Sequence, residues 1–380
     1  MDYLSPVSRP LTQTTTGQFS SGAKAAFDVV VTRGELVESR HRVHVAVVDS
    51  RGDLRLAARD SRLLTWWRSC AKPFQLLPLL ESGAFDTLPW GDDEIALACA
   101  SHGGEPEHVA IAGQMLASIG LEEGDLACGP HEPLSARGSR VLRESGGRPT
   151  RLHNNCSGKH AAMLAFAKSI GAPTTGYEHK AHPVQQVIRR VIDEWSGAAP
   201  DEVQQAVDGC GVVVFGLPLY NMALSYARFA QAAMRGDKAP RRIVNAMIRS
   251  PFLVGGTDRF DTILMEAAGG RVMCKVGAEG VHTVALLDRN IGIAVKVEDG
   301  SPRAQYMAVI GVLLELDVFP QGVPESLREY VVKPIRNTRG EEVGEMRLDS
   351  RVESRTERIG DARSEMQSGD MHIAPNGDIA

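Results

Sequence analysis

Two residues with complementary chemistry stand three positions apart near residue 70: a serine, Ser69, and a lysine, Lys72. On a helix this spacing places the hydroxyl and the amine on one face, close enough for the amine to accept the hydroxyl proton. Only a neutral amine can accept a proton, so Lys72 needs burial or a neighbouring cation that lowers its pKa. The Ser-x-x-Lys spacing therefore predicts a serine nucleophile at Ser69 that Lys72 activates.

A second lysine and a second serine could complete this centre. Serine acyl-hydrolases of the β-lactamase type combine Ser-x-x-Lys with a Lys-Thr-Gly-like sequence on a late strand. Here a Lys-Val-Gly sequence begins at Lys275, whose charge would lower the pKa of Lys72 and face a substrate carboxylate. Between the two lysines, Ser101 precedes a flexible His-Gly-Gly segment and could relay a proton. We therefore predict one site from Ser69, Lys72, Ser101 and Lys275.

Two cysteines mark another candidate site. Cys156 opens a predicted helix, and a helix N-terminus lowers the pKa of a thiol and attracts anions. Cys156 could thus be a nucleophile, a metal ligand, part of a carboxylate-binding site, or a buried structural thiol. Cys210 stands at the head of an apolar strand, where it and Asp208 could meet Cys156 in space. The sequence has no Cys-x-x-Cys pair, so the spacing matches no zinc finger or zinc ribbon.

The overall composition restricts the partners and the compartment. The 380 residues carry a net charge of −5 without an extended basic run, which argues against nucleic acid or an anionic membrane as partner and favours a small-molecule substrate. The sequence has no secretory signal and no apolar run of about 18 residues, so we expect a cytoplasmic protein. Its cysteines are widely spaced in a long chain and are expected to be reduced.

The elements around Ser69 can be predicted from local patterns. Two short apolar runs, 44–48 and 54–58, flank a glycine-containing turn and read as a β-hairpin. From Lys72 to Glu81, apolar residues recur every three positions, which predicts a helix. A proline at position 73 requires this helix to begin near Ser69–Cys70, and a proline at position 78 should kink it.

The rest of the chain reads as a helical middle followed by strands. The expected helices are Glu105–Ile119, Ser157–Ile170, Pro183–Trp195, Asn221–Met234, Pro240–Ile248 and Phe260–Ala267. The expected strands are Arg271–Val276, Val281–Leu287 and Ile291–Val297, and the expected last helix is Ala304–Leu316.

This order predicts an α+β fold in which one antiparallel sheet is built from both chain ends, with an inserted helical subdomain. The active site should lie in the crevice between the two parts. The expected boundaries are 23–345 for a single domain, with the sheet at about 29–60 and 271–316 and the helical middle at 69–268, and 1–22 and 346–380 for disordered ends.

Several longer motifs stand along the chain: RSCAKPFQLLPLLESGA, ASHGGEPEHV, CGPHEPL, HNNCSGKHAAML, GYEHKAHPVQ, DGCGVVVFGLPLYNMALSYARFA, GTDRFDTILM and KVGAEGVH. Taken together, from about Val29 to Leu316, they resemble the asparaginase II family of the Rhizobium type. This resemblance implies a serine-β-lactamase/glutaminase-like fold, a homodimer, and hydrolysis of L-asparagine to L-aspartate and ammonia.

The resemblance also assigns roles by motif position. It implies two Ser–Lys pairs, which are Ser69 with Lys72 and Ser101 with Lys275. It implies that three further residues line the substrate pocket, namely Arg68, His102 and Asp208.

A zinc site beside the pocket is implied as well, with Cys156, Lys159 and Cys210 as its ligands. A lysine ligand must be deprotonated, so zinc binding would depend on pH. In this scheme zinc tunes affinity and is not required for catalysis. The sequence does not indicate a role for Cys70.

Three other functions stay open at this point. An acyl-hydrolase of the same architecture could act on glutamine or on β-lactam-like amides, and the sequence does not separate asparagine from glutamine. Cys156 could be the nucleophile of a thiol enzyme. A zinc-dependent binding protein centred on Cys156 and Cys210 would bind its ligand tightly without releasing ammonia.

Overall fold

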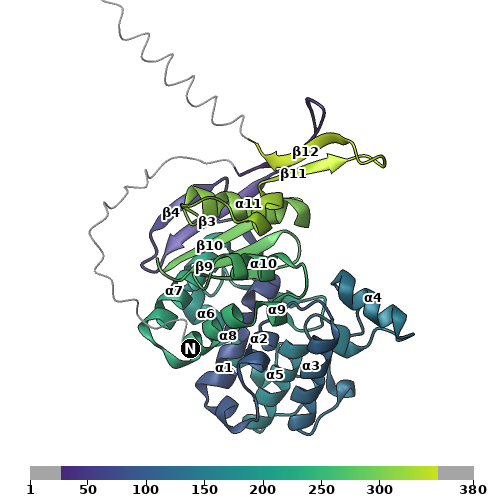
Figure 1. The fold of residues 1–380 in the computed structure, drawn as a ribbon. Helices are drawn as coiled ribbons and strands as arrows, with labels where there is room; N and C mark the ends of the chain where they lie inside the picture. Colours follow the sequence, from purple (N-terminus) through teal and green to yellow (C-terminus); the bar gives the residue numbers. More distant parts are fainter. Residues whose placement is uncertain (1–26, 350–380) are drawn as a thin grey trace, which may run out of the picture.

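The computed structural model describes residues 27–349 (Figure 1). Most helices gather at one end of the molecule, and the two larger sheets lie toward the other end (Figure 1). The expected disordered segment 1–22, and the expected tail beyond residue 349, lie outside the described residues. In the described range, no helix is both long and apolar enough to cross a membrane.

The central sheet is antiparallel and has strands from both parts of the sequence. Its order is β4-β3-β10-β9-β8. The strands are β3 (Val43–Asp49), β4 (Leu54–Ala58), β8 (Val272–Val276), β9 (Val281–Leu286) and β10 (Ile291–Val297). The early hairpin joins the late strands through β3 and β10, whose register pairs Val43 with Val297 and Asp49 with Ile291. The predicted α+β class, with a sheet assembled from both chain ends, is therefore confirmed.

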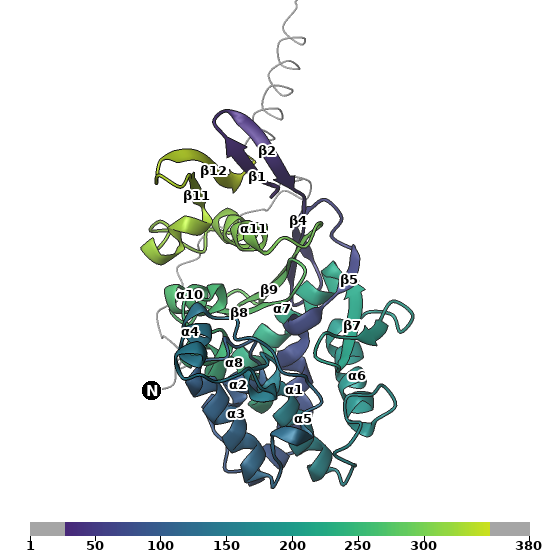
Figure 2. The same ribbon diagram turned by 90° about the vertical axis from the view of Figure 1, so that its right-hand side faces the viewer.

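Two helices cover the central sheet, α7 (Leu219–Arg235) and α11 (Pro302–Glu315). They pack on opposite faces of the sheet, as the turned view shows (Figure 2). Contact with α7 is closest at Gly292 of β10, where a Cβ atom would lie 1.8 Å from the carbonyl oxygen of Ala223. Only glycine fits at this position, and the alanines of α7 allow the same close approach from the helix side.

A second sheet corrects the prediction that residues 29–60 form part of one sheet. Its order is β11-β12-β1-β2, with strands β1 (Val29–Arg33), β2 (Leu36–His41), β11 (Val332–Arg336) and β12 (Glu342–Leu348). Strand β2 alternates exposed and partly buried residues, so only one of its faces packs, whereas β3 is buried almost throughout. Strand β12 continues to Leu348, inside the predicted tail, because it pairs with β1 at Val29.

The helical part of the molecule lies on the side of α7 that faces away from the central sheet. Its helices are α1 (Lys72–Glu81), α2 (Asp92–Ala98), α3 (Pro106–Ser118), α4 (Ala136–Glu144), α5 (Ser157–Ser169), α6 (Pro183–Ser196), α8 (Lys238–Arg249), α9 (Pro251–Val254) and α10 (Phe260–Ala267). The short 3₁₀ helices are η1 (Arg68–Ala71), η2 (Ala84–Thr87), η3 (Glu123–Asp125), η4 (Arg151–His153) and η5 (Glu325–Tyr330). A small sheet, β5-β7-β6, consists of β5 (Leu64–Trp66), β6 (Gln204–Val207) and β7 (Val213–Pro218).

The start of α1 differs from the prediction in one respect. The helix was expected to begin near Ser69–Cys70 so that it could accommodate Pro73. Instead the 3₁₀ helix η1 occupies that stretch, and α1 begins at Lys72 with Pro73 in its first turn. Proline is tolerated there because the amide it lacks would have no partner within the helix. Ser69 is therefore held in a tight turn directly before the helix that carries Lys72.

Candidate active site

The turn that carries Ser69 is held from several sides. The thiol of Cys70 donates to the carbonyl oxygen of Lys275 at 3.0 Å, and the hydroxyl of Tyr226 donates to the carbonyl oxygen of Cys70 at 2.8 Å. Arg68 has a positive φ of 53°, which is unfavourable for a side-chain-bearing residue and needs such support. Cys70 thus has a structural role, which is to tie the Ser69 turn to the strand of Lys275.

The neighbouring strand end comes equally close. A Cβ atom at Gly277 would lie 3.1 Å from Cys70 Sγ and 3.2 Å from the carbonyl oxygen of Trp67. The glycine of the Lys-Val-Gly sequence therefore lets β8 approach η1. Burial raises the pKa of Cys70 to about 12, so its thiol stays protonated and acts as a donor.

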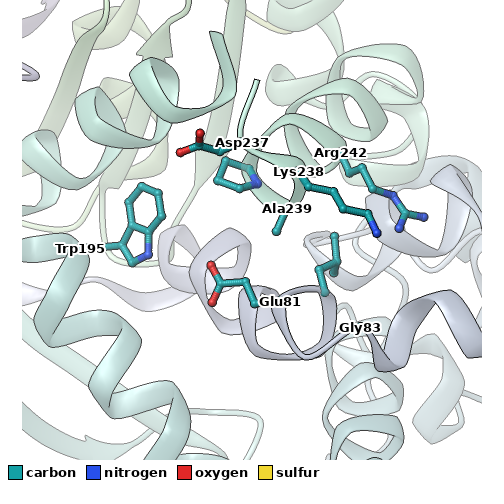
Figure 3. Close-up of a pocket in the computed structure, with 9 residues that line it drawn as sticks. Glu81, Gly83, Trp195, Asp237, Lys238, Ala239 and Arg242 are labelled. Carbon is teal, nitrogen blue, oxygen red and sulfur yellow. The ribbon is translucent and has the colours of Figure 1, made fainter. Parts of the chain in front are cut away.

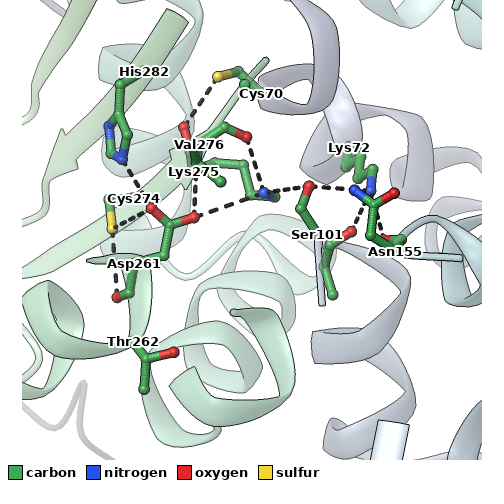
Figure 4. A network of polar contacts seen from close by, with 12 residues as sticks. Cys70, Lys72, Ser101, Asn155, Asp261, Thr262, Cys274, Lys275, Val276 and His282 are labelled. Carbon is green, nitrogen blue, oxygen red and sulfur yellow. Dashed lines mark hydrogen bonds and ion pairs between the residues drawn. The ribbon is translucent and has the colours of Figure 1, made fainter. Parts of the chain in front are cut away.

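The two predicted lysines converge on one hydroxyl (Figure 4). Lys275 Nζ lies 2.9 Å from Ser101 Oγ, and Lys72 Nζ lies 3.3 Å from the same oxygen. Lys72 also donates to the carbonyl oxygens of Ala100 and Asn155, the latter at 3.2 Å. Three of the four predicted centre residues are thus in direct contact, although they come from α1, the loop after α2, and β8.

The surroundings of Lys72 make it a candidate base. Burial lowers the pKa of Lys72 to about 8, and the positive charges of Lys159 and Lys275 act in the same direction. The thiols of Cys156 and Cys210 act in the opposite direction without reversing the shift. A substantial fraction of this amine is neutral at mildly alkaline pH.

Lys275 has a partner that the sequence analysis missed, Asp261 of α10. The Asp261 carboxylate lies 3.7 Å from Lys275 Nζ, 2.8 Å from His282 Nε2, and accepts the backbone N–H of Val276 at 2.8 Å (Figure 4). Burial alone would raise the pKa of Asp261, but the hydrogen bond from His282 and the charges of His282 and Lys275 hold it well below its usual value. Asp261 therefore places a negative charge beside the Lys275 amine.

The same cluster contains residue types that bind metal ions, but its carboxylate oxygens are already engaged in hydrogen bonds. Potential ligand atoms of Asp261, Cys274 and His282 all lie within 4.8 Å of one another, and all three residues are buried. Each Asp261 oxygen already accepts a hydrogen bond, and one of them also faces Lys275. The cluster is explained by its support of Lys275.

Ser69 lies apart from this network and faces open space. It is partly exposed and lines a cavity of about 360 Å³ together with Ser101 and Asn155. The backbone N–H of Lys72 donates to the carbonyl oxygen of Ser69, but among the described residues no side-chain hydrogen bond joins Ser69 Oγ to Lys72 Nζ, which is turned toward Ser101. Ser69 is therefore the more accessible of the two serines, and Ser101 is the one held by both amines.

The residues expected to line the substrate pocket are engaged elsewhere. Arg68 Nε lies 2.9 Å from Asp208 Oδ1, so these two charges pair with each other. His102 is fully buried, accepts the N–H of Gly104 at Nδ1 and donates from Nε2 to Ser157 at 2.9 Å. Burial holds the pKa of His102 well below its usual value. None of the three is among the residues that line the cavity, and His102 ties the Ser101 loop to α5.

The predicted zinc ligands meet in one buried cluster. Lys159 Nζ lies 3.0 Å from Cys210 Sγ, and Cys156 shares a hydrogen bond with Cys210. That hydrogen bond and the charge of Lys159 lower the pKa of Cys210 to about 4, whereas the hydrogen bond and burial raise the pKa of Cys156 to about 12. Two sulfurs and one nitrogen fit the ligand preference of zinc, provided that Lys159 gives up its proton.

Two other cavities lie away from the serines. One of about 320 Å³ separates α1, α6 and α8 and is lined by Glu81, Trp195 and Lys238 (Figure 3). Another, of about 630 Å³, lies between α11 and the outer sheet, which is the four-stranded sheet β11-β12-β1-β2. Neither is lined by a residue of the predicted centre.

The fold and the site together define an α+β protein in which two buried amines meet one hydroxyl beside an accessible serine. A family model described as L-asparaginase II matches residues 29–348, and the chain belongs to the L-asparaginase II family. No curated protein matches the sequence.

Solved structures with a related outline are distant. The protein Mglu in its native form has 15% sequence identity and a TM-score of 0.41, over 73% of this chain and 64% of that chain, so the present chain spans less than two thirds of Mglu. A β-lactamase from Mycobacterium bovis has 11% identity and a TM-score of 0.40, over 72% and 94% of the two chains. An octameric penicillin-binding protein homologue from Pyrococcus abyssi has 14% identity and a TM-score of 0.36, over 76% of each chain.

Proposed function

We propose that this protein is an amidohydrolase that converts L-asparagine and water to L-aspartate and ammonia. Its centre would consist of Ser69, Lys72, Ser101 and Lys275. The observation that carries the proposal is the convergence of two buried lysine amines on Ser101 Oγ, at 2.9 and 3.3 Å, beside a serine that faces a cavity. Membership of the L-asparaginase II family supports the choice of substrate.

In the first half-reaction, Ser69 Oγ attacks the carbon of the side-chain carboxamide and its proton passes to the neutral amine of Lys72. The backbone N–H of Ser69, at the start of η1, is a candidate donor to the developing oxyanion. The C–N bond then breaks. The leaving nitrogen takes a proton from the Lys72–Ser101 pair and departs as ammonia, which leaves an acyl ester on Ser69.

In the second half-reaction, water attacks the ester carbon and gives its proton to the same amine–hydroxyl pair. The bond between the acyl carbon and Ser69 Oγ breaks, Ser69 recovers a proton, and L-aspartate leaves. Lys275, whose amine lies 2.9 Å from Ser101 Oγ and 3.7 Å from the Asp261 carboxylate, keeps the Ser101 hydroxyl oriented through both steps and adds positive charge near the developing oxyanion.

Zinc, if bound, would be held by Cys156, Lys159 and Cys210 and would add positive charge beside the substrate site. Its contribution would be to affinity, since no step above needs it. The homodimer and the cytoplasmic location stay predictions of the family resemblance and of the sequence.

The test is ammonia release from L-asparagine and, separately, from L-glutamine by the purified protein. Ser69→Ala should lower the rate on asparagine by about 10³-fold or more, while Ser82→Ala on the exposed end of α1 should leave it unchanged. Near-normal turnover by Ser69→Ala would make Ser101 the nucleophile. Faster release from glutamine would mark a glutaminase, and tight binding of asparagine without ammonia would mark a binding protein.

A further inference from the structure

The cavity beside Ser69 contains two charged side chains that the mechanism above does not use. Among its described lining residues, only Arg259 and Glu279 carry a charge. Within residues 27–349, neither side chain has a hydrogen bond or an ion pair, either with another residue or with each other. Arg68 and Asp208, by contrast, already neutralise each other. The cavity therefore offers a ligand one cation and one anion that are not paired with each other, although the charge of Lys296 attracts that of Glu279.

Arg259 has a fixed backbone. It directly precedes α10, and the loop before it is held by the buried carboxylate of Glu105, which accepts from the N–H of Thr257 at 2.7 Å and from its hydroxyl at 2.8 Å. Arg137 in turn pairs with Glu105. The preceding residue, Asp258, has a positive φ of 58°, a strained conformation that this support maintains. A flexible side chain thus projects from a rigid base.

Glu279 stands in the turn between β8 and β9 and is held in a comparable way. Its φ is 62°, in the left-handed region where glycine is the usual residue. The turn is pinned because Lys296 Nζ donates to the carbonyl oxygen of Glu279 at 2.6 Å. Glycine would adopt this conformation at a lower cost, so the strain is accepted here at a residue that lines the cavity.

We infer that Arg259 and Glu279 bind the α-carboxylate and the α-ammonium group of the amino-acid substrate. A guanidinium matches a carboxylate with two parallel N–H donors, and an exposed carboxylate suits an ammonium group. Both charges share one cavity with Ser69, so a bound amino acid would direct its side-chain amide to the serine. The inference rests on the proposed amidohydrolase function and makes Arg259 and Glu279 the residues that select amino acids over simple amides.

Two truncated substrates separate the two contacts. β-Alaninamide is asparagine without its α-carboxylate, and succinamate is asparagine without its α-amino group. Arg259→Gln should lower kcat/KM for L-asparagine by about 10- to 100-fold, mainly through KM, because a charge-assisted contact is lost. It should leave kcat/KM for β-alaninamide nearly unchanged. Glu279→Gln should likewise lower kcat/KM for L-asparagine by about 10- to 100-fold. It should leave kcat/KM for succinamate nearly unchanged.

Controls keep the outcomes distinct. Arg51→Gln, on an exposed turn, should change neither substrate preference, and Arg259→Lys, which keeps the charge, should recover part of the preference for asparagine. The inference is wrong if Arg259→Gln lowers kcat/KM for L-asparagine and for β-alaninamide equally and Arg259→Lys does not restore the preference for asparagine. The amidohydrolase function would still stand. If the unaltered protein releases no ammonia from any of the three amides, both proposals fail.

Discussion

Lys72 and Lys159 are both buried lysines of the helical part, with side chains that are almost completely inaccessible, yet their surroundings act on them in opposite ways. Lys72 donates to a hydroxyl and two carbonyl oxygens, and burial lowers its pKa to about 8. Lys159 faces the sulfur of Cys210 at 3.0 Å, and the charge of that thiolate outweighs burial and raises its pKa.

The difference shows that burial alone does not make a lysine a base. Neutral oxygen partners leave the desolvation of Lys72 uncompensated, whereas a thiolate stabilises the ammonium of Lys159. One side chain is suited to take a proton from a hydroxyl, and the other to hold an anion in place. Changes to the partners should therefore have effects of very different size in the two regions.

The largest effect is expected at the candidate base. Lys72→Met removes the amine and keeps an unbranched apolar side chain in its place, so the fold should persist while kcat falls by about 10²- to 10⁴-fold, the usual contribution of a general base. Ammonia release measures the loss, and Lys238→Met, the same change at an exposed position, is the matched control. A variant that keeps more than a tenth of the activity would remove Lys72 from the mechanism.

The next effect concerns Lys275. Asp261→Asn replaces the carboxylate that lies 3.7 Å from the Lys275 amine with a neutral amide. The ion pair that positions this amine against Ser101 is then lost, so kcat on L-asparagine should fall by about 10-fold. Asp28→Asn removes another buried carboxylate, paired with Arg59, and should leave kcat unchanged. An unchanged kcat in Asp261→Asn would show that Asp261 is only a packing residue.

A third effect separates the two lysines through pH. Below the Lys72 pKa of about 8, kcat/KM should fall about tenfold per pH unit as the amine takes up a proton. Because its folded pKa lies below the model-compound value of 10.5, Lys72 contributes stability that is complete above pH 10.5 and is lost as the pH falls through 8. Lys159 has a raised pKa, so its contribution is complete below pH 10.5 and is lost at higher pH.

Urea unfolding between pH 7.5 and 10.5 can measure these slopes. The unfolding free energy of Lys72→Met should rise less with pH over this interval than that of the unaltered protein. Lys159→Met should show no such change in slope. Equal slopes in all three proteins would mean that the two lysines titrate alike.

The smallest effect on turnover is expected at Cys156. Its raised pKa, about 12, keeps the thiol protonated and makes it a poor nucleophile at neutral pH. Cys156→Ala, assayed in the presence of a chelator, should retain kcat within about threefold of the unaltered protein. Abolished turnover under these conditions would instead support the thiol-nucleophile alternative and would refute the Ser69 assignment.

Much of the fold follows from local sequence patterns. Strand β10 has the predicted bounds, and helix α1 ends at the predicted Glu81, shortly before Gly83, although it begins at Lys72 after η1. Helix α4 was missed because most of its surface is polar and exposed, so it carries little apolar periodicity. The outer sheet was also missed, since β1 finds its partner more than 300 residues away in β12, and no local pattern reports such a pairing.

The residues of the site could be predicted from the sequence where they belong to short motifs that are typical of a known chemistry. Ser101 and Lys275 were assigned from short motifs and do meet in space. Asp261 was overlooked because an acidic residue in the first turn of a helix is ordinary, as it favours the helix dipole. A sign was present nonetheless, since Asp261 is the one charged residue in the first turn of α10. Arg259 could not be placed, because its role depends on the cavity.

The contacts of Lys275 with Ser101 and with the Ser69 turn also determine how late during synthesis the centre can assemble. Residues of the hairpin and of α1 leave the ribosome long before β8, which must supply Lys275 and the carbonyl oxygen that holds Cys70. Contacts so distant in sequence form late, because a long loop has to close first. A nascent chain that ends before residue 275 therefore lacks Lys275, one of the four residues of the centre, and the Ser69 turn gains its contacts with β8 only after that strand has emerged.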